Sequence, residues 1–395
     1  MTNKINLVVM GTFNYPYGMA GTKRVQHVIN ALKQYSDVSI QVILQRQSSR
    51  DNILCGIHEG TPYQTVMGDL FRAKMVALLP LFYLKTIRVL KDVWRQNGTN
   101  IIYHYGPVSL DNLLPLYFSR RLGYKIVFDI VEDNDVAKSI SSSFYHCAQV
   151  SCISVLSSIM PALASGFVAI SSHLVNKYRT LCRGCIPVHY LPISVDMDCF
   201  PDKPFRMDQK TVSLFYGGSF GRKDGLPVLL DAFDRLAGIH QNVRLVLTGR
   251  GDKAAQQEFS DRLEMSPYKN WIEYKGYLDE KEYYSVLNDV DIPCMTRVDL
   301  AFAHAGFPFK LGEFLATGKP VIASRVSDVD SFLAHGHNAM LVQAGSSTEI
   351  FEAADYLINN PESAAAIGGR GREVASTYFD YRQRGTALLK FLKSL

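Results

Sequence analysis

The chain has 395 residues, of which 47% are apolar and 20% charged, and its formal net charge is +5. This balance is typical of globular proteins and excludes a disordered chain, a collagen and a coiled coil. The length predicts two domains, each able to bury a sizeable core. The basic excess lies in residues 1–200, which favours an anionic partner such as phospholipid, nucleic acid or a phosphorylated substrate.

The first half of the chain alternates short apolar runs with helical patterns. Apolar residues at helical spacing predict a helix over 23–34, and the short apolar runs predict buried strands. The strands expected here are 5–10, 38–44, 101–104, 125–129 and 166–170. Strands separated by helical stretches indicate a parallel sheet with crossover helices.

A proline-rich stretch at 176–204 is expected to be irregular and contains a domain boundary at about residue 200. Beyond it the alternation restarts, with strands expected at 212–216, 244–248, 272–274, 292–295 and 320–324 and helices at 225–236, 280–288 and 309–316. The sequence thus predicts two doubly wound α/β domains, 1–200 and 201–378. A final helix within 379–395 would close the fold and pack back on the N-terminal domain.

The cellular compartment is inferred from the start of the chain and from the cysteines. The first apolar run is too short for a secretory signal, and seven cysteines in a chain this long form no disulfide framework. We therefore expect a reducing cytosol. Cys182 and Cys185 have CxxC spacing, but the sequence contains no second pair of this kind. A structural loop or incidental thiols are therefore favoured over zinc or redox chemistry.

Three glycine-rich loops directly follow expected strands, at 11–22, 216–225 and 248–251. Ligands of open parallel sheets lie at the carboxyl ends of the strands, and glycine lets backbone N–H groups approach an anion there. The second loop adds Arg222 and Lys223, which suit a diphosphate. For the first and third loops an ordinary tight turn is the alternative, and for the second it is solvated surface charge.

The sharpest signal is the segment 306–324. Pro308 suits a helix start and Gly318 the end of that helix, and Lys310 and Glu313 share one face between them. A carboxylate can accept both hydroxyls of a ribose, while the helix N-terminus and a lysine meet phosphate. An exposed ion pair between these two side chains is the alternative.

In this order the motifs resemble the retaining glycosyltransferases of family 4. These enzymes have the GT-B fold, in which two Rossmann-like domains face a deep interdomain cleft. The resemblance covers nearly the whole chain and rests on 217–223, 248–251, 276–278 and 307–324, with 18–22, 169–171 and 192–196 in the first half. It implies transfer of a sugar from a nucleoside diphosphate sugar to a hydroxyl of a glycan or lipid-linked acceptor, with retention of configuration, in cell-surface polysaccharide or glycoconjugate synthesis.

The resemblance also implies roles for the domains and for single residues. The N-terminal domain would bind the acceptor and the C-terminal domain the nucleotide sugar. His104 matches the family's active-site histidine loosely, and a satisfied histidine at a strand end is an equal alternative. Ala305 stands where the family usually has the first of two glutamates, so the donor sugar stays open. The donor-binding residues implied are Gly21, Thr22, Gly218, Arg222, Lys223, Gly249, Arg250, Leu278, Phe309, Lys310 and Glu313.

In the sugar transfer that the resemblance implies, negative charge develops on the diphosphate as it leaves the sugar. Arg222, Lys223 and Lys310, together with a helix N-terminus, would stabilise that charge in place of a divalent metal. We therefore expect no metal and no cofactor beside the nucleotide sugar. The acidic run 133–135 is not placed like a metal-binding motif at the donor diphosphate, and the leaving phosphate itself could accept the acceptor's proton.

The acceptor side has two unusual segments. Basic residues surround an apolar stretch within 69–96, a helical pair that could lie on an anionic bilayer. An ordinary core helix pair with a basic rim is the alternative. Residues 139–172 contain no charged side chain, which favours a buried helix and a loop lining the acceptor cleft. We expect a cytoplasmic protein that contacts the inner face of the membrane peripherally.

Three other classes of protein are weighed against the glycosyltransferase. A sugar-nucleotide epimerase shares the two-domain architecture but needs acid/base groups, and few candidates exist beyond His104, Asp129 and Glu132. A non-enzymatic two-lobed ligand-binding protein is disfavoured by the missing secretory signal and the cationic glycine-rich loop. A nucleic-acid partner is not expected, because no arginine-rich stripe interleaved with aromatic residues is present.

Overall fold

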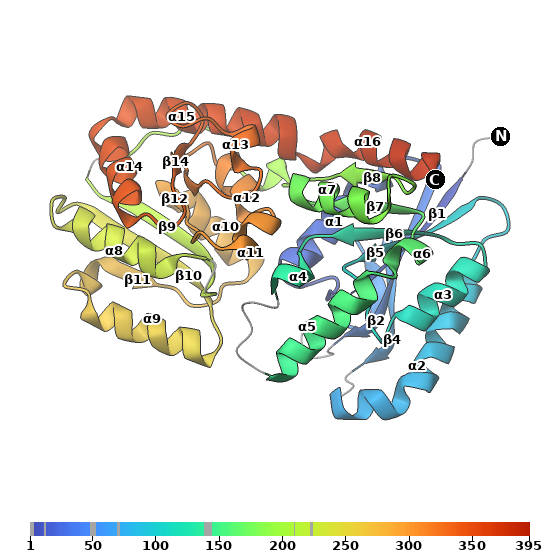
Figure 1. Cartoon of the computed structure of the whole chain (residues 1–395). Helices are drawn as coiled ribbons and strands as arrows, with labels where there is room; N and C mark the ends of the chain where they lie inside the picture. The colour runs from blue at the N-terminus through green and yellow to red at the C-terminus, as the bar shows by residue number, and fades with distance from the viewer. Residues whose placement is uncertain are drawn as a thin grey trace. The chain divides into compact units, whose positions relative to one another are not determined.

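The computed structural model describes residues 4–11, 13–47, 53–68, 72–137, 144–208, 210–221 and 224–395. The chain forms two compact units. The first comprises Met1–Pro192 and Tyr381–Leu395, and the second comprises Ile193–Asp380. Each unit is built on a sheet flanked by helices (Figure 1).

In the first unit, the described strands form a sheet in the order β3-β4-β2-β1-β5-β6-β7-β8. Neighbouring strands are parallel except for β3 and β4. The apolar run of the first strand is buried along its whole length, as a central parallel strand requires. The strands are β1 (Ile5–Gly11), β2 (Val38–Gln47), β3 (Cys55–His58), β4 (Thr61–Gly68), β5 (Thr99–Tyr105), β6 (Lys125–Ile130), β7 (Gly166–Ala169) and β8 (Val188–Tyr190).

The described helices of the first unit include the last helix of the chain. It packs on the first one so closely that a Cβ on Gly385 would lie 2.5 Å from the carbonyl oxygen of Ala31. Its Leu388 and Leu392 join the core of this unit. The helices are α1 (Ala20–Lys33), α2 (Arg72–Val93), α3 (Leu113–Arg121), α4 (Asn134–Ala137), α5 (Phe144–Ser157), α6 (Met160–Leu163), α7 (Ser172–Leu181) and α16 (Tyr381–Ser394).

Two expectations for this half were wrong. The stretch 176–204 is not irregular throughout, because α7 continues to Leu181 and β8 then pairs with β7. The helical pair expected within 69–96 is a single helix, α2, with Pro80 inside it. Among the described residues, no helix is both long enough and apolar enough to cross a membrane.

In the second unit, the described strands form a parallel sheet in the order β11-β10-β9-β12-β13-β14. The order reverses between β9 and β12, which is the position where open α/β sheets bind their ligands. The strands predicted at 272–274 and 292–295 are confirmed residue for residue. The strands are β9 (Val212–Ser219), β10 (Val243–Arg250), β11 (Ile272–Tyr274), β12 (Ile292–Met295), β13 (Ile322–Ser324) and β14 (Met340–Val342).

The helices of the second unit bury apolar faces against this sheet. In α8 the buried residues Leu229, Phe233 and Leu236 recur at helical spacing and belong to the unit's core. The described α-helices are α8 (Leu226–Ala237), α9 (Lys253–Met265), α10 (Glu280–Asp289), α11 (Ala301–Ala305), α12 (Lys310–Ala316), α13 (Val329–Phe332), α14 (Ser347–Asn359) and α15 (Pro361–Val374). Shorter helical turns are Met197–Cys199, Lys269–Trp271 and Ala375–Phe379.

Candidate functional site

Two of the predicted glycines lie side by side at the carboxyl ends of β9 and β10. Gly218 and Gly249 are direct neighbours in the register of the two strands. A Cβ on Gly249 would lie 1.7 Å from the carbonyl oxygen of Gly218, and Gly249 has a φ of 131°. Both facts require glycine at position 249. Glycine thus lets the two strand ends approach each other closely, and both glycines are half-buried there.

The loop after β11 is held against the same strand ends. The hydroxyl of Thr248 and the backbone N–H of Gly249 both donate to the carbonyl oxygen of Gly276, at 2.8 and 2.9 Å. This anchors the segment that carries Tyr277 and the half-buried Leu278. The guanidinium of Arg250 lies over the ring of Tyr277, 4.3 Å from its centroid. The structure thus brings Gly218, Gly249 and Arg250 together and places Leu278 on the loop anchored beside them.

On α12, Glu313 and Lys310 each contact a tyrosine of α10. Tyr283 and Tyr284 donate their hydroxyls to the two carboxylate oxygens of Glu313, Oε2 at 3.1 Å and Oε1 at 3.2 Å. The ammonium of Lys310 lies 4.2 Å from the centroid of the Tyr283 ring, a cation–π contact. Burial lowers the pKa of Lys310, while Glu313 and Asp224 act in the opposite direction. Instead of the exposed ion pair that was the alternative, the structure has each side chain in contact with α10.

The Tyr283 ring also joins this pair to the glycine-rich end of β9. A Cβ on Gly217 would lie 2.9 Å from Cε2 of Tyr283, so the ring rests directly on the backbone of that strand. Phe215 contributes to the same packing, with its ring 6.1 Å from Tyr283 and 5.8 Å from Phe314 of α12. Lys310 and Glu313 therefore lie beside the glycines of β9, in one site at the switch point of the sheet.

Tyr283 and Tyr284 were not predicted from the sequence. They follow the N-terminal cap of α10, where Asp279 and Glu282 form a capping box. Burial and the neighbouring carboxylate of Glu313 raise the pKa of both phenols, which keeps them neutral hydrogen-bond donors. Nothing in their sequence distance from Glu313 indicates the contact, because it depends on how α10 and α12 pack.

A buried lysine fixes the opposite end of α10. Lys319 follows α12 and donates to the carbonyl oxygens of Leu287, Asn288 and Val290, the first at 3.0 Å. These carbonyls lack intrahelical partners because the helix ends there, and a cation is favoured at such an end. Burial lowers the pKa of Lys319 to about 8. The segment after α12 thus holds the helix that carries Tyr283 and Tyr284.

The structure describes only some of the other site residues predicted in the second half of the chain. Arg222 and Lys223 lie outside the described residues. Their neighbour Asp224 accepts a hydrogen bond from Ser219 and donates its N–H to the carbonyl oxygen of Gly221 at 2.9 Å. Phe309 is half-buried at the start of α12, and the methyl group of Ala305 is buried.

In the first unit, Gly21 and Thr22 form the first turn of α1 after the carboxyl end of β1. A Cβ on Gly21 would lie 2.9 Å from the hydroxyl oxygen of Tyr105, so the helix passes close to the end of β5. The buried hydroxyl of Thr22 donates to the carbonyl oxygen of Asn14 at 2.7 Å. The hydroxyl of Thr22 thus holds the preceding loop in place. The backbone of the same helical turn lies at the switch point between β1 and β5, where a ligand is expected.

The arrangement of His104 does not fit the catalytic role expected for it. The side chain is completely buried, with Nδ1 2.9 Å from the carbonyl oxygen of Gly106 and Nε2 3.1 Å from Nδ2 of Asn112. Nδ1 therefore carries the proton, and Nε2 accepts from the amide. Burial lowers the pKa of His104 to about 4, so the ring is neutral near pH 7. With both nitrogens engaged, His104 matches the alternative, a satisfied histidine that holds the loop after β5.

The remaining titratable candidates also have protein partners. Asp133, in the acidic run 133–135, accepts from Nε2 of His173 at 2.9 Å and from Lys177. Among the residues that the structure describes, no group of three or more His, Cys, Asp or Glu side chains is placed to hold a metal ion. Cys182 is buried and Cys185 exposed, and both are free thiols.

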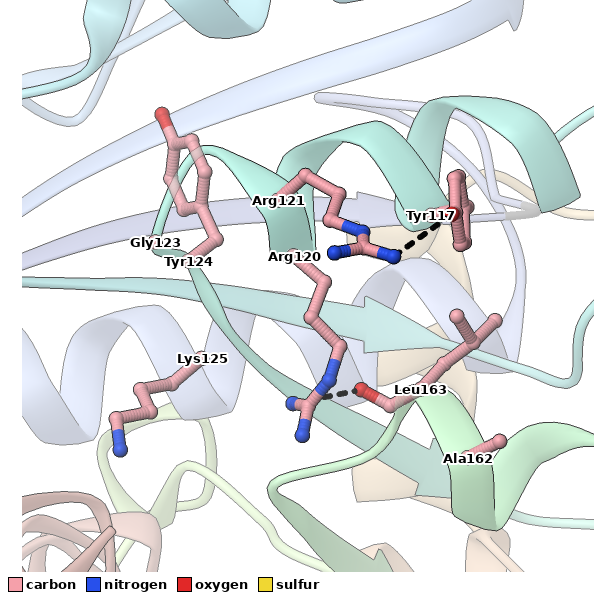
Figure 2. A pocket seen from close by; sticks show the side chains of 8 residues that line it. All are labelled: Tyr117, Arg120, Arg121, Gly123, Tyr124, Lys125, Ala162 and Leu163. Atoms are coloured by element: carbon pink, nitrogen blue, oxygen red, sulfur yellow. Dashed lines mark hydrogen bonds between the residues drawn. The ribbon is translucent and has the colours of Figure 1, made fainter.

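A cavity of about 490 Å³ lies at the opposite, amino-terminal end of β6. Figure 2 shows Arg120, Arg121 and Lys125 around it. Arg120 donates to the carbonyl oxygen of Leu163 at 3.2 Å, and Arg121 donates to the hydroxyl of Tyr117 at 3.2 Å. The cavity is lined by basic side chains. It lies at the amino-terminal ends of the strands, whereas the switch point lies at their carboxyl ends.

The second unit is similar to known glycosyltransferases. Residues 211–360 match the family described as glycosyl transferases group 1. The chain is similar to a phosphatidyl-myo-inositol mannosyltransferase of Mycobacterium leprae, with 27% identity over 220 residues, which are 54% of this chain and 55% of the relative. The chain thus spans about half the length of the curated relatives it matches.

Solved structures match over nearly the whole chain. Sucrose-phosphate synthase from Thermosynechococcus elongatus gives a TM-score of 0.80 at 14% identity, covering 99% of this chain and 98% of that one. Anabaena HepE in complex with UDP gives a TM-score of 0.73 at 16% identity, covering 99% and 100%. At these identities the likeness shows the fold, which is GT-B. The resemblance to GT-B glycosyltransferases that the sequence indicated is confirmed.

Proposed function

We propose that the protein is a retaining glycosyltransferase of family 4 whose second unit binds a nucleoside diphosphate sugar. The observation that carries this proposal is the placement of Glu313 and Lys310 at the glycine-rich carboxyl end of β9, where the Tyr283 ring contacts both side chains and Gly217. A carboxylate and an ammonium at the switch point suit a ribose and a diphosphate. The UDP complex of Anabaena HepE, a protein of the same fold, supports this choice of ligand.

In the proposed reaction the C–O bond between the anomeric carbon and the diphosphate breaks, and a bond to the acceptor hydroxyl forms on the same face of the sugar. Lys310, with Arg222 and Lys223, stabilises the charge that develops on the leaving diphosphate. The acceptor's proton passes to the leaving phosphate, so the reaction requires no histidine base. The proposal includes no metal ion, because these cations balance the diphosphate.

The epimerase alternative is weakened by the state of two of its three acid/base candidates, Asp129 and His104. Both carboxylate oxygens of Asp129 accept from Arg24, and both ring nitrogens of His104 are engaged. Neither group is left to move a proton on a sugar. No specific observation favours the non-enzymatic ligand-binding protein.

The nucleotide-binding step is tested by a thermal-shift screen with UDP, GDP and ADP. One of them is expected to raise the melting temperature, because a ligand at about 100 times its Kd adds ~2.7 kcal/mol to the stability of the native state. In Glu313→Gln the shift should shrink strongly. The matched control, Glu258→Gln, changes an exposed glutamate of α9 and should keep the full shift. A Glu313→Gln shift equal to that of the wild type would refute the ribose role.

For the acceptor, we propose a lipid-linked or glycan substrate at an anionic membrane surface. On α2, exposed apolar and basic residues recur at helical spacing along one face, and α3 adds more of both. A surface that combines these two kinds of side chain suits an anionic bilayer. The name of the mycobacterial relative, which joins a mannosyltransferase to phosphatidyl-myo-inositol, also supports a lipid acceptor. The exposed residues are Leu81, Leu84, Lys85, Arg88, Lys91, Leu114, Tyr117, Phe118, Arg120 and Arg121.

Membrane contact is tested by sedimentation with vesicles of phosphatidylcholine, with and without phosphatidylglycerol. The wild type is expected to sediment with the anionic vesicles only. Reversing the charges of Lys85, Arg88 and Lys91 to glutamate should abolish this, since each basic residue near such a surface contributes about 1 kcal/mol. The same reversal at the exposed Lys203, Lys253 and Lys281 of the second unit is the control for net charge. Equal losses in both triple variants would count against a specific membrane face.

A further inference from the structure

The carboxylate of Glu313 is held on both of its oxygens by phenols from one helix. Oε2 accepts from Tyr283 and Oε1 from Tyr284. An ionised carboxylate offers about four acceptor positions, two on each oxygen. The two phenols use one position on each oxygen, which leaves one on each for a ligand. Two vicinal hydroxyls, one for each oxygen, would complete this arrangement.

The tyrosines themselves are firmly placed. Tyr284 packs edge to face on Phe200, with centroids 5.2 Å apart, and Tyr283 packs between Phe215 and Lys310. The helix that carries both is capped at its start and fixed at its end by Lys319. A glutamate has three rotatable side-chain bonds, and ordering it on ligand binding would cost affinity. The phenols order it before a ligand arrives.

We infer that Tyr283 and Tyr284 are positioning residues that set the selectivity of the site for an intact ribose over a deoxyribose. This inference rests on the proposed role of Glu313 in nucleotide binding. A freely rotating glutamate can still accept one hydroxyl well, so it distinguishes ribose from deoxyribose weakly. A fixed carboxylate aims one acceptor at each hydroxyl, and a missing hydroxyl then leaves one acceptor position unpaired beneath the bound ligand.

Phenylalanine is the informative substitution at both positions. It removes the hydroxyl but keeps the ring, so the contacts of Tyr283 with Lys310 and Gly217 are retained. The experiment measures Kd by calorimetry for the nucleoside diphosphate found in the thermal-shift screen and for its 2′-deoxy and 3′-deoxy analogues. The proteins are the wild type, Tyr283→Phe, Tyr284→Phe and the double variant. Tyr356→Phe, an exposed tyrosine of α14, is the control.

We expect the wild type to bind the ribonucleotide at least about 10-fold more tightly than either deoxy analogue, since an unpaired polar position costs one to two orders of magnitude. Each single variant should reduce this ratio several-fold, and the double variant should bring it close to one. Affinity for the deoxy analogues should change little. A ratio that is unchanged in the double variant would overturn the inference, and so would an equal loss for all three ligands, which indicates a merely structural role.

The outcome for Glu313→Gln separates this inference from the proposed function. If Glu313→Gln loses the ribose preference while the tyrosine variants keep it, the glutamate binds ribose without help from the phenols. If Glu313→Gln binds all three ligands like the wild type, the proposed nucleotide site itself is wrong.

Discussion

Replacing Lys310 with methionine is expected to lower kcat by about 100-fold or more, the range seen when one charge-stabilising group is removed from an active site. The ammonium is half-buried and lies against the face of Tyr283 beside the glycines of β9. Methionine keeps most of the side chain's volume and lacks the charge, and with it the cation–π contact to Tyr283. Because the charge matters most when the diphosphate departs, KM should change less than kcat.

The measurement is steady-state turnover of the nucleotide sugar with an acceptor, run with and without EDTA. Lys281→Met is the control, an exposed lysine on α10. Lys223→Ala is expected to lower turnover just as steeply, since it removes a cation from the loop proposed to hold the same diphosphate. A kcat near that of the wild type in Lys310→Met would exclude its role at the leaving group. Loss of all turnover in EDTA would contradict a reaction without a metal.

The parts of the site that the sequence predicted are those fixed by local rules. Glycines at the carboxyl ends of β9 and β10 follow from strand–loop–helix chemistry, although both strands extend through them, and Lys310 and Glu313 share a helix face because of their spacing. The strand at 292–295 is recognisable because it is a short apolar run between helical patterns, whereas the strand at 272–274 has only Ile272 buried. In these places local sequence and tertiary structure agree.

The parts that were missed depend on packing between distant segments. The contacts of Tyr283 and Tyr284 with Glu313 join residues about 30 positions apart, through two helices on one side of a sheet. The hairpin of β3 and β4 escaped prediction because β3 is largely exposed and has no buried alternation. For His104 the sequence allows two roles, and its burial and its hydrogen bonds to Gly106 and Asn112 favour the structural one.

A buried ion pair in the first unit was also invisible in the sequence. Nε and Nη2 of Arg24 on α1 donate to the two carboxylate oxygens of Asp129 on β6, both at 2.8 Å. The same guanidinium donates to the carbonyl oxygens of Leu191 and Pro192, both at 3.0 Å. Arg24 is 3% exposed and Asp129 0%. Although it follows the first glycine-rich loop, this arginine is fully occupied by the protein and is not a ligand group.

Arg24→Met is therefore expected to destabilise the protein by about 3–5 kcal/mol, because it leaves a buried carboxylate without its counter-charge. Two carbonyl groups at the end of the first unit also lose their donor. This loss is a large part of the free energy of unfolding, which is about 5–15 kcal/mol for a typical folded protein. It is measured by urea unfolding, followed by tryptophan fluorescence and circular dichroism. Arg179→Met, at an exposed position of α7, is the control and should stay within about 0.5 kcal/mol of the wild type.

The double variant Arg24→Met, Asp129→Leu shows whether the unpaired charge causes the loss. Buried ion pairs replaced by apolar residues are often close to neutral in stability, so the double variant should recover part of what the single one loses. A recovery of stability would also indicate that the packing of α1 is preserved. This helix carries Gly21 and Thr22 past the end of β5. If the double variant is less stable than Arg24→Met by the full cost of a second substitution, the guanidinium acts mainly through Leu191 and Pro192. In that case the pair's role is to fasten the end of the first unit rather than to neutralise Asp129.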